Sequence, residues 1–391
     1  MSSLQYHSNE LYFGGKSLVN FKDTPQYVYD LDGIRKRLAI FRSALASNSK
    51  IHYAIKANSN LEVLSLFQKE GTGIDVVSGG EIQRAISAGF FPNQIIFSGV
   101  AKTVSEIELA IDLGISQINV ESPQELERIG KIANYRKKKT SVAFRINPDV
   151  DPHTHPYITT GFRENKFGME EKMIPGLLKL VQANPYLELK GLTMHIGSQI
   201  KDLQPFSEAI DKMQALFLSI RSQGFSIESL DIGGGLGINY ENPMSYTDTE
   251  LLIQNYGKML QKIKIPNCQI LCEPGRILVA NFGVLLAEIQ YVKETSHKNF
   301  LILNTGMHHL IRPTLYQAYH HVLPLKLDPK RKEKTYDLVG PICESSDVLA
   351  KNRKLQESFS GELLAIADVG AYGFTMSSRY NEHELAKEIC I

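Results

Sequence analysis

The chain of 391 residues has few of the features that mark secreted, membrane-bound or nucleic-acid-binding proteins. Its charges nearly cancel, with 43 Lys and Arg against 42 Asp and Glu, so net charge favours neither nucleic acid nor an anionic membrane. The first residues lack a basic segment followed by an apolar core, and no apolar run approaches the length of a membrane span. We therefore expect a cytoplasmic protein that binds neither nucleic acid nor membranes.

Cysteine is scarce as well, and its spacing excludes a disulfide framework or a zinc site built from paired Cys-x-x-Cys units. The four cysteines are Cys268, Cys272, Cys343 and Cys390. Cys268 and Cys272 are four residues apart on one predicted strand, so they share a face and are expected to fill the core. Cys343 lies among turn formers and acidic residues in 340–347, which suits an exposed thiol in a site.

What the sequence does contain is a regular alternation of strand and helix patterns. Eight apolar, β-rich runs start near Ile51, Ile74, Gln94, Gln117, Ser141, Leu189, Ile227 and Cys268. Capping boxes at 78–81, 103–106 and 122–125 mark helix starts between them, and Gly89 and Gly114 fall where helices usually stop. Eight such repeats over roughly 250 residues predict an α/β protein with a closed (β/α)₈ barrel of the TIM type.

The pattern changes beyond the eighth strand. From about Gly283 the helical periodicity fades, and short strand patterns follow at 285–292, 300–303, 336–339 and 363–367. These predict a second, mainly β domain with a sandwich or barrel form. The strand-like segment Gln26–Tyr29 precedes the first barrel repeat and is expected to join it. We predict a barrel domain over 31–280 and a β domain over 1–30 plus 281–391.

Residues with chemical potential follow the last two predicted barrel strands. In a parallel barrel, the loops after strands seven and eight often hold a phosphate, because glycine lets backbone N–H groups approach its oxygens. The glycine run 233–235 and Arg276 predict such a phosphate cradle. Glu273 lies beside it at a strand tip, where catalytic groups collect.

Other strand tips supply an amine and an imidazole. Lys56 ends the first strand, and His195 and Ser198 follow the sixth. A lysine, a phosphate cradle and a carboxylate around one barrel mouth are what pyridoxal phosphate requires: an amine for the Schiff base, donors for the phosphate, and an anion that keeps the ring nitrogen protonated. His195 is expected to lie against the ring, and Ser198 to donate to the phosphate.

Seven motifs, in this order, extend the argument to nearly the whole chain: 53–58, 73–81, 195–199, 231–235, 273–276, 343–347 and 370–373. Together they resemble the pyridoxal-phosphate decarboxylases that act on ornithine, arginine and diaminopimelate, which combine an alanine-racemase-like barrel with a β domain. The segments 145–149, 154–161 and 311–316, with the glutamate after Cys343, resemble the members that act on diaminopimelate.

The resemblance implies a role for each matching residue. The cofactor-binding set would be Lys56, Asp75, His195, Ser198, Gly234, Gly235, Glu273, Gly275, Arg276 and Tyr372. Lys56, His195, Glu273 and Cys343 would be catalytic, with Cys343 returning a proton to the α-carbon after carbon dioxide leaves. The family also implies a homodimer with shared active sites, in which Cys343 and Glu344 reach into the site of the neighbouring subunit.

Diaminopimelate, the substrate that the resemblance implies, has a second amino-acid group far from the bond that breaks. The carboxylate and the ammonium of this distal group both need partners in the site. The predicted substrate-binding residues are Arg276, Arg312, Tyr316, Glu344 and Tyr372. Paired arginines clasp a carboxylate through planar forks, tyrosine hydroxyls donate to it, and a glutamate accepts from the ammonium. Ornithine would instead require an acidic pocket for a lone amine, without paired arginines.

Three alternatives remain open from the sequence. An ornithine- or arginine-type decarboxylase would share the same fold. A metal-dependent barrel hydrolase would use the acidic and histidine side chains Asp149, Asp151, His153 and His155, although we predict no metal site. A non-catalytic relative should have lost the lysine or the cysteine, and this chain has both Lys56 and Cys343.

Overall fold

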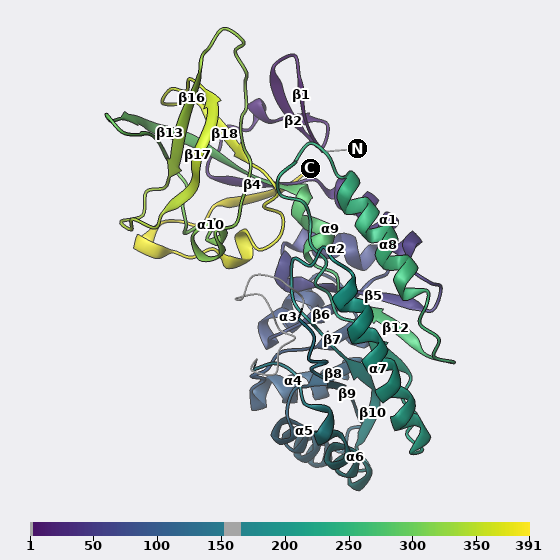
Figure 1. Ribbon diagram of the computed structural model, residues 1–391. Helices are drawn as coiled ribbons and strands as arrows, with labels where there is room; N and C mark the ends of the chain where they lie inside the picture. The colour runs from purple at the N-terminus through teal and green to yellow at the C-terminus, as the bar shows by residue number, and fades with distance from the viewer. Residues whose placement is uncertain (1–2, 152–165) are drawn as a thin grey trace. The chain divides into compact units, whose positions relative to one another are not determined.

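The computed structural model describes residues 3–151 and 166–391 and divides the chain into two compact units. The barrel unit comprises residues 40–237 and 252–275, and the β unit comprises residues 1–39, 238–251 and 276–391 (Figure 1). No helix in the described part of the chain combines the length and the apolar character needed to cross a membrane.

Eight parallel strands close a barrel in the barrel unit, as predicted. They are β5 (Ser49–Ala54), β6 (Gly73–Val76), β7 (Ile95–Phe97), β8 (Gln117–Val120), β9 (Thr140–Arg145), β10 (Leu187–Thr193), β11 (Ser229–Asp231) and β12 (Gln269–Cys272). Neighbouring strands pair in chain order, and β12 pairs with β5 to complete the ring. Every strand begins at or close to its predicted position. The expectation that Cys268 and Cys272 are buried is also confirmed.

Helices alternate with the barrel strands. Their bounds are α1 (Leu31–Ala44), α2 (Leu61–Lys69), α3 (Gly79–Ser87), α4 (Val104–Leu113), α5 (Pro123–Arg136), α6 (Ile174–Ala183), α7 (Gln204–Ser222) and α8 (Thr247–Leu260). Each of these helices from α2 to α7 buries an apolar stripe, as in α7, where Phe206 and Phe217 are fully buried. This periodic burial explains why the helices were recognisable from the sequence.

The predicted helix caps are present, with one difference in detail. Thr103 and Glu106 form a reciprocal capping box at the start of α4, and Gly114 ends that helix with a left-handed φ of 69°. In α3 and α5 the cap serine accepts as predicted, but the glutamate accepts from the N–H of the residue before the cap. The longer reach ties the incoming strand to the first turn of the helix.

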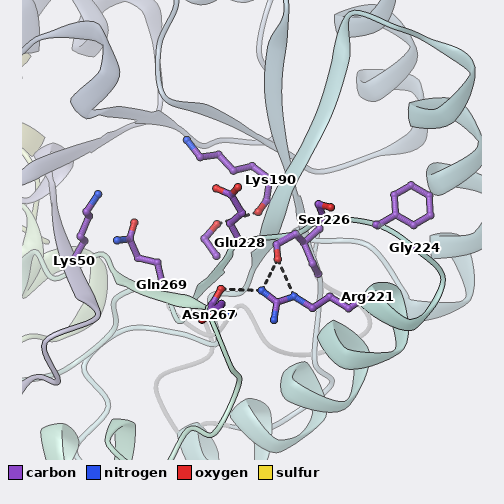
Figure 2. A pocket seen from close by; sticks show the side chains of 11 residues that line it. Lys50, Lys190, Arg221, Gly224, Ser226, Glu228, Asn267 and Gln269 are labelled. Atoms are coloured by element: carbon purple, nitrogen blue, oxygen red, sulfur yellow. Dashed lines mark hydrogen bonds between the residues drawn. The ribbon is translucent and has the colours of Figure 1, made fainter.

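An open hollow of about 920 Å³ is lined by residues at the N-terminal ends of β5, β11 and β12 and by Lys190 of β10 (Figure 2). Arg221, at the end of α7, fixes this side of the barrel. Its guanidinium donates to the carbonyl oxygens of Ile227, at 2.8 and 3.0 Å, and of Asn267, at 2.9 Å. These bonds hold the segments that lead into β11 and β12, whose opposite ends carry the predicted catalytic residues. Contacts at this end of a barrel usually serve stability.

The β unit is built on a long central strand. Its elements are β1 (Leu4–His7), β2 (Glu10–Phe13), β3 (Lys16–Ser17), β4 (Gln26–Tyr29), α9 (Arg276–Val279), β13 (Gly283–Glu294), β14 (Asn299–Leu303), α10 (Arg312–Tyr316), β15 (Val322–Pro324), β16 (Glu333–Val339), β17 (Val348–Gln356), β18 (Leu363–Ile366) and β19 (Lys387–Cys390). The main sheet runs β15-β18-β13-β14-β16-β17, and β4 pairs with β13 and β19. The mainly β second domain is thus confirmed, and Gln26–Tyr29 joins it.

Candidate active site

Three acidic side chains gather at the carboxyl ends of barrel strands. Asp75 lies in β6, Asp231 ends β11 and Glu273 follows β12, and all three are buried. Burial raises the pKa of each carboxyl group, and the neighbouring acids raise the pKa of Glu273 further. The pKa of Asp231 reaches about 7. The site therefore holds more negative charge than its interior can easily stabilise.

Lys56 is the cation that faces these acids. It lies in a single 3₁₀ turn, Ile55–Ala57, directly after β5. Its positive charge opposes the effect of burial on the pKa values of Asp75 and Glu273, and it adds to burial in lowering that of His195. The structure thus brings together four of the barrel residues predicted to bind the cofactor: Lys56, Asp75, His195 and Glu273.

His195 connects this cluster to the glycine run. The Gly234 N–H donates to Nδ1 of His195 at 3.3 Å, which leaves the ring proton of a neutral imidazole on Nε2. Burial lowers the pKa of His195 well below its usual value, so the ring is neutral at physiological pH. A neutral, flat side chain is suited to pack against an aromatic ring.

The glycines are required by close packing between loops. A Cβ on Gly233, Gly234 or Gly235 would lie only 2.2–2.4 Å from the carbonyl oxygens of Met194, Glu273 and Gly197, respectively. The loop that carries Ser198 is tied to the same run, because the Ile200 N–H donates to the Gly235 carbonyl at 2.9 Å. Gly275 is similarly confined, with Ala57 3.0 Å from its ideal Cβ. The predicted phosphate-binding loops therefore lie side by side.

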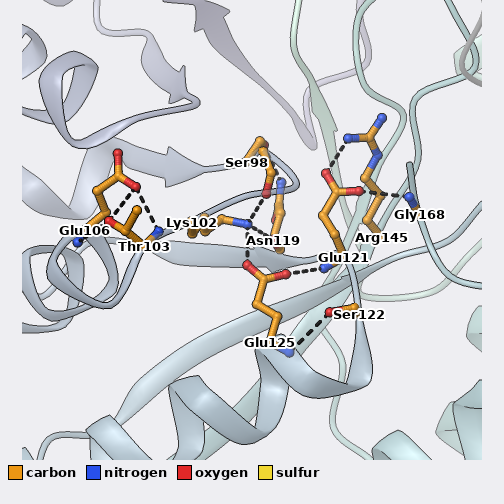
Figure 3. Close-up of polar contacts among 11 residues, drawn as sticks. Ser98, Lys102, Thr103, Glu106, Asn119, Glu121, Ser122, Glu125, Arg145 and Gly168 are labelled. Atoms are coloured by element: carbon orange, nitrogen blue, oxygen red, sulfur yellow. Dashed lines mark hydrogen bonds and ion pairs between the residues drawn. The ribbon is translucent and has the colours of Figure 1, made fainter. Parts of the chain in front are cut away.

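Arg145 is a buried cation that sequence reasoning did not assign to the site. It pairs with Glu121, whose other carboxylate oxygen accepts from Gly168 N–H at 2.8 Å (Figure 3). Its charge opposes the burial-raised pKa values of Asp75 and Asp231. The sequence does point to Arg145, because this residue opens the segment 145–149, which resembles the family members that act on diaminopimelate.

Beside Arg145, Figure 3 also shows an ion pair that is almost fully buried. Lys102 Nζ lies 2.7 Å from Glu125 Oε1 and donates to the carbonyl oxygens of Gly99 and Asn119, at 2.6 Å each. Glu125 Oε2 in turn accepts from the Glu121 N–H at 2.6 Å. A buried ammonium with three acceptors is well compensated, and this network orients Glu121 toward Arg145.

Three of the predicted substrate residues of the β unit, Arg276, Arg312 and Tyr372, form a cluster with Tyr240, whereas Glu344 accepts a hydrogen bond from Tyr380. Arg276 donates to the Tyr240 hydroxyl at 2.8 Å, and its guanidinium carbon lies 4.8 Å from the ring centre of Tyr372. Arg312 lies over the ring of Tyr240, with its guanidinium carbon 4.7 Å from the centre. Tyr240 was missed from the sequence, although it follows the glycine run by only a few residues, in a loop of the kind that carries barrel active sites.

A buried histidine orients Arg312. The Nδ1 atom of His320 lies 2.8 Å from the Ala367 carbonyl and must donate to it, so Nε2 is free to accept from Arg312 at 2.8 Å. Burial and the charge of Arg312 both keep the pKa of His320 well below its usual value. Tyr316 lies one turn after Arg312 in α10, on the same face of that helix. Arginine and tyrosine are thus presented together, as the proposed carboxylate clasp requires.

Comparison with known proteins identifies the family. Residues 31–280 match the family described as pyridoxal-dependent decarboxylase, pyridoxal binding domain. The chain belongs to this family. It is similar to the diaminopimelate decarboxylases of Aquifex aeolicus, 41% identical over 99% of this chain and 92% of that protein, and of Vibrio cholerae, 43% identical over 96% and 89%. A crystal structure of diaminopimelate decarboxylase from Helicobacter pylori with L-lysine has a TM-score of 0.87 and 40% identity, covering 96% of this chain and 93% of that one.

The site of this pyridoxal-dependent decarboxylase fits its cofactor. Glu273 Oε1 is buried without a hydrogen-bond partner among the described residues, and Asp231 Oδ2 is in the same situation. Such atoms are costly unless a donor arrives, and a protonated ring nitrogen is a donor of suitable charge. Lys56, whose charge acts on the Glu273 carboxyl group, is an amine of the kind that can hold the aldehyde of the cofactor.

Two predicted features lie outside the described residues. These are His153 and His155 of the alternative metal site, and the segment 154–161 used in the resemblance. Within 3–151 and 166–391, no group of three or more potential metal-binding side chains is found. Cys343 is exposed, as predicted.

Proposed function

We propose that this protein decarboxylates meso-2,6-diaminopimelate to L-lysine and carbon dioxide, the last step of lysine biosynthesis. The observation that carries the proposal is the pair of buried arginines around Tyr240, presented with Tyr316 and Tyr372. Such a cluster suits the distal carboxylate of diaminopimelate, which ornithine and arginine do not possess. Similarity to diaminopimelate decarboxylases over nearly the full chain supports the same substrate.

The barrel residues have separate tasks in this reaction. Bound pyridoxal phosphate supplies an electron sink for the carbon–carbon bond that breaks. Lys56 would hold the cofactor, Glu273 would keep the ring nitrogen protonated, Asp75 would contribute to cofactor binding, and His195 would pack on the ring face. Ser198, Gly234, Gly235, Gly275, Arg276 and Tyr372 would bind the phosphate.

The β-unit residues act on the substrate. Arg276 and Arg312 would bind the distal carboxylate, and Glu344 would accept from the distal ammonium. Cys343 would return a proton to the α-carbon as general acid, and its exposed thiol supports this role. We propose that Cys343 and Glu344 act in the neighbouring subunit of a homodimer. A cytoplasmic location is in keeping with four cysteines that are all free of disulfides.

The test is a product assay with purified protein and pyridoxal phosphate. We expect L-lysine from meso-diaminopimelate, and no amine product from ornithine or arginine. Lys56→Ala should lower turnover by about a thousandfold or more, because it removes the group that holds the cofactor. Lys50→Ala, at the opposite end of the same strand, is the matched control and should leave turnover unchanged. Release of putrescine or agmatine would refute the substrate assignment.

A further inference from the structure

The segment 378–383 of the β unit contacts the two residues proposed to act on the substrate. The Tyr380 hydroxyl donates to Glu344 Oε1 at 2.6 Å. The Cys343 N–H donates to Asn381 Oδ1 at 3.3 Å. One dipeptide, Tyr380-Asn381, thus holds both the proposed acceptor of the substrate ammonium and the proposed proton donor. We call the segment 378–383 the bracing segment.

Its backbone is unusual at the point of contact. Asn381 and Glu382 both adopt positive φ angles, 55° and 60°, in the left-handed region. Asparagine tolerates this region, whereas glutamate adopts it only with backbone strain. Consecutive left-handed residues other than glycine persist only where the surroundings fix them. The bend turns the Asn381 amide toward Cys343, so the contact depends on the bracing segment being anchored.

A turn at residues 305–309 anchors both ends of the bracing segment. Ser378 N–H donates to the His308 carbonyl at 2.8 Å, and the ring of His383 lies 4.7 Å from that of His308. His308 is itself fully buried and lies against His309, with ring centres 3.7 Å apart. These tilted ring contacts and the Ser378 hydrogen bond hold the bracing segment on either side of Tyr380 and Asn381.

The same turn supports the other side of the Cys343–Glu344 loop. Asp347 is buried, and its two carboxylate oxygens accept from the N–H groups of Met307, at 2.6 Å, and Ile342, at 2.8 Å. Asp347 therefore fixes both flanks of the loop, whereas Tyr380 and Asn381 fix the residues at its tip. Cys343 and Glu344 are exposed. Within the loop, the Glu344 N–H donates to the Ile342 carbonyl at 2.7 Å and the Glu344 carbonyl accepts from the Asp347 N–H at 3.1 Å, so Tyr380 and Asn381 add contacts from outside the loop.

We propose that Tyr380 and Asn381 are positioning residues of the decarboxylase: Tyr380 orients the Glu344 carboxylate for the substrate ammonium, and Asn381 sets the position of the Cys343 thiol. Tyr380 should therefore determine substrate affinity and selectivity, and Asn381 the rate of proton return. The inference rests on the proposed function, because it assumes that Glu344 and Cys343 act on diaminopimelate. It extends that function to two residues that do not themselves perform the chemistry.

Steady-state kinetics with meso-diaminopimelate test the role of Tyr380. Tyr380→Phe keeps the ring but loses the donor, and we expect KM to rise about tenfold while kcat changes less than about twofold, since one hydrogen bond to a charged group is at stake. Tyr291→Phe, an exposed tyrosine of β13, is the matched control and should match the wild type. An unchanged KM for Tyr380→Phe would overturn the role of Tyr380.

Three variants separate the effect of the Asn381 side-chain hydrogen bond from the effect of its backbone conformation. Asn381→Gly keeps access to positive φ but loses the acceptor, so kcat should fall about tenfold with KM unchanged. Asn381→Asp keeps both features and should restore kcat. Asn381→Ala loses both features and should be the slowest. A kcat for Asn381→Gly equal to that of the wild type would refute the proposal.

Two further measurements distinguish positioning from general stability. Melting temperature and cofactor absorbance of Tyr380→Phe and Asn381→Asp should match the wild type, because these substitutions change exposed hydrogen bonds of small energetic value and leave the backbone conformation accessible. If the wild type itself releases no lysine from diaminopimelate, the proposed function fails. If the wild type is active and the variants are kinetically unchanged, only the positioning role fails.

Discussion

At the scale of single residues, the most informative observation is an excess of buried acid. Asp75, Asp231 and Glu273 are buried, and the cations that oppose this burial are Lys56 and Arg145, with Lys102 acting on Asp75 as well. Stability alone would not favour such an arrangement, because a buried charge without its own partner is costly. A cationic ring nitrogen of the bound cofactor would compensate the excess of acid. The acids are therefore better explained by cofactor binding than by folding.

This explanation predicts that Glu273→Gln stabilises the cofactor-free protein in alkaline solution. The pKa of Glu273 is raised in the folded protein. The destabilisation by its ionised carboxylate is therefore absent below pH 4 and grows as pH rises toward the folded pKa. At pH 8 the variant should melt a few degrees higher than the wild type, and at pH 4.5 the difference should shrink. Turnover with cofactor should fall at least about a hundredfold.

Scanning calorimetry of cofactor-free protein at the two pH values provides the measurement. Glu127→Gln changes an exposed glutamate on α5 and should shift the melting temperature little at either pH. A Glu273→Gln protein that melts lower than the wild type at pH 8 would show that the carboxylate is stabilising, contrary to this account.

Site residues could be predicted where the neighbouring sequence identified them. Lys56, His195 and Glu273 follow recognisable strands, and barrel geometry places such tips around one mouth. Tyr240 and His320 were not predicted, because their importance arises from side-chain contacts made only in the folded chain: Tyr240 contacts Arg276, 36 residues away, and His320 accepts from Arg312, eight residues away. No periodicity carries that information.

At the scale of elements, the barrel was predictable and part of the β unit was not. Barrel strands are buried and nearly continuous in apolar residues, so each stands out between polar helices. The strand β17 was not predicted from the sequence, because its central residues, 351–354, are polar and mostly exposed where β17 pairs with β16. Asn352 there has a φ of 53°, and the register with β16 shifts nearby. Such a bulge interrupts the alternation on which strand prediction depends.

The glycine run leads to a prediction about an element. A Cβ on Gly234 would lie 2.2 Å from the Glu273 carbonyl, so Gly234→Ala must push apart the loops after β11 and β12. We expect a loss of about 1–3 kcal/mol in the free energy of unfolding, and at least about tenfold weaker cofactor binding. Denaturant titration and fluorescence titration with pyridoxal phosphate measure the two effects.

Gly176→Ala is the matched control for that substitution. Gly176 lies inside α6, and no heavy atom is within 4 Å of its ideal Cβ. Alanine there should stabilise the protein by about 0.4–1 kcal/mol and leave cofactor binding unchanged. If Gly234→Ala behaved like this control, close packing of the loops would not explain the glycine run.

At the scale of the whole molecule, the proposed catalytic residues divide between the two units. Lys56, His195 and Glu273 belong to the barrel unit, whereas Cys343 and Glu344 belong to the β unit. In the homodimer proposed above, each site combines the barrel residues of one subunit with Cys343 and Glu344 of the other. Symmetric dimers present the same surface twice, so two equivalent shared sites result.

If each active site is shared between two subunits, two inactive variants should regain activity when they combine in one dimer. Lys56→Ala and Cys343→Ala, unfolded and refolded together in equal amounts, should give about a quarter of wild-type activity, because half the dimers are mixed and each mixed dimer has one intact site. Lys56→Ala with Glu273→Gln is the matched control, since both changes affect the barrel side and no site without a substitution can form. Mixed dimers of the first pair that stay inactive would place all catalytic groups of each site in one subunit.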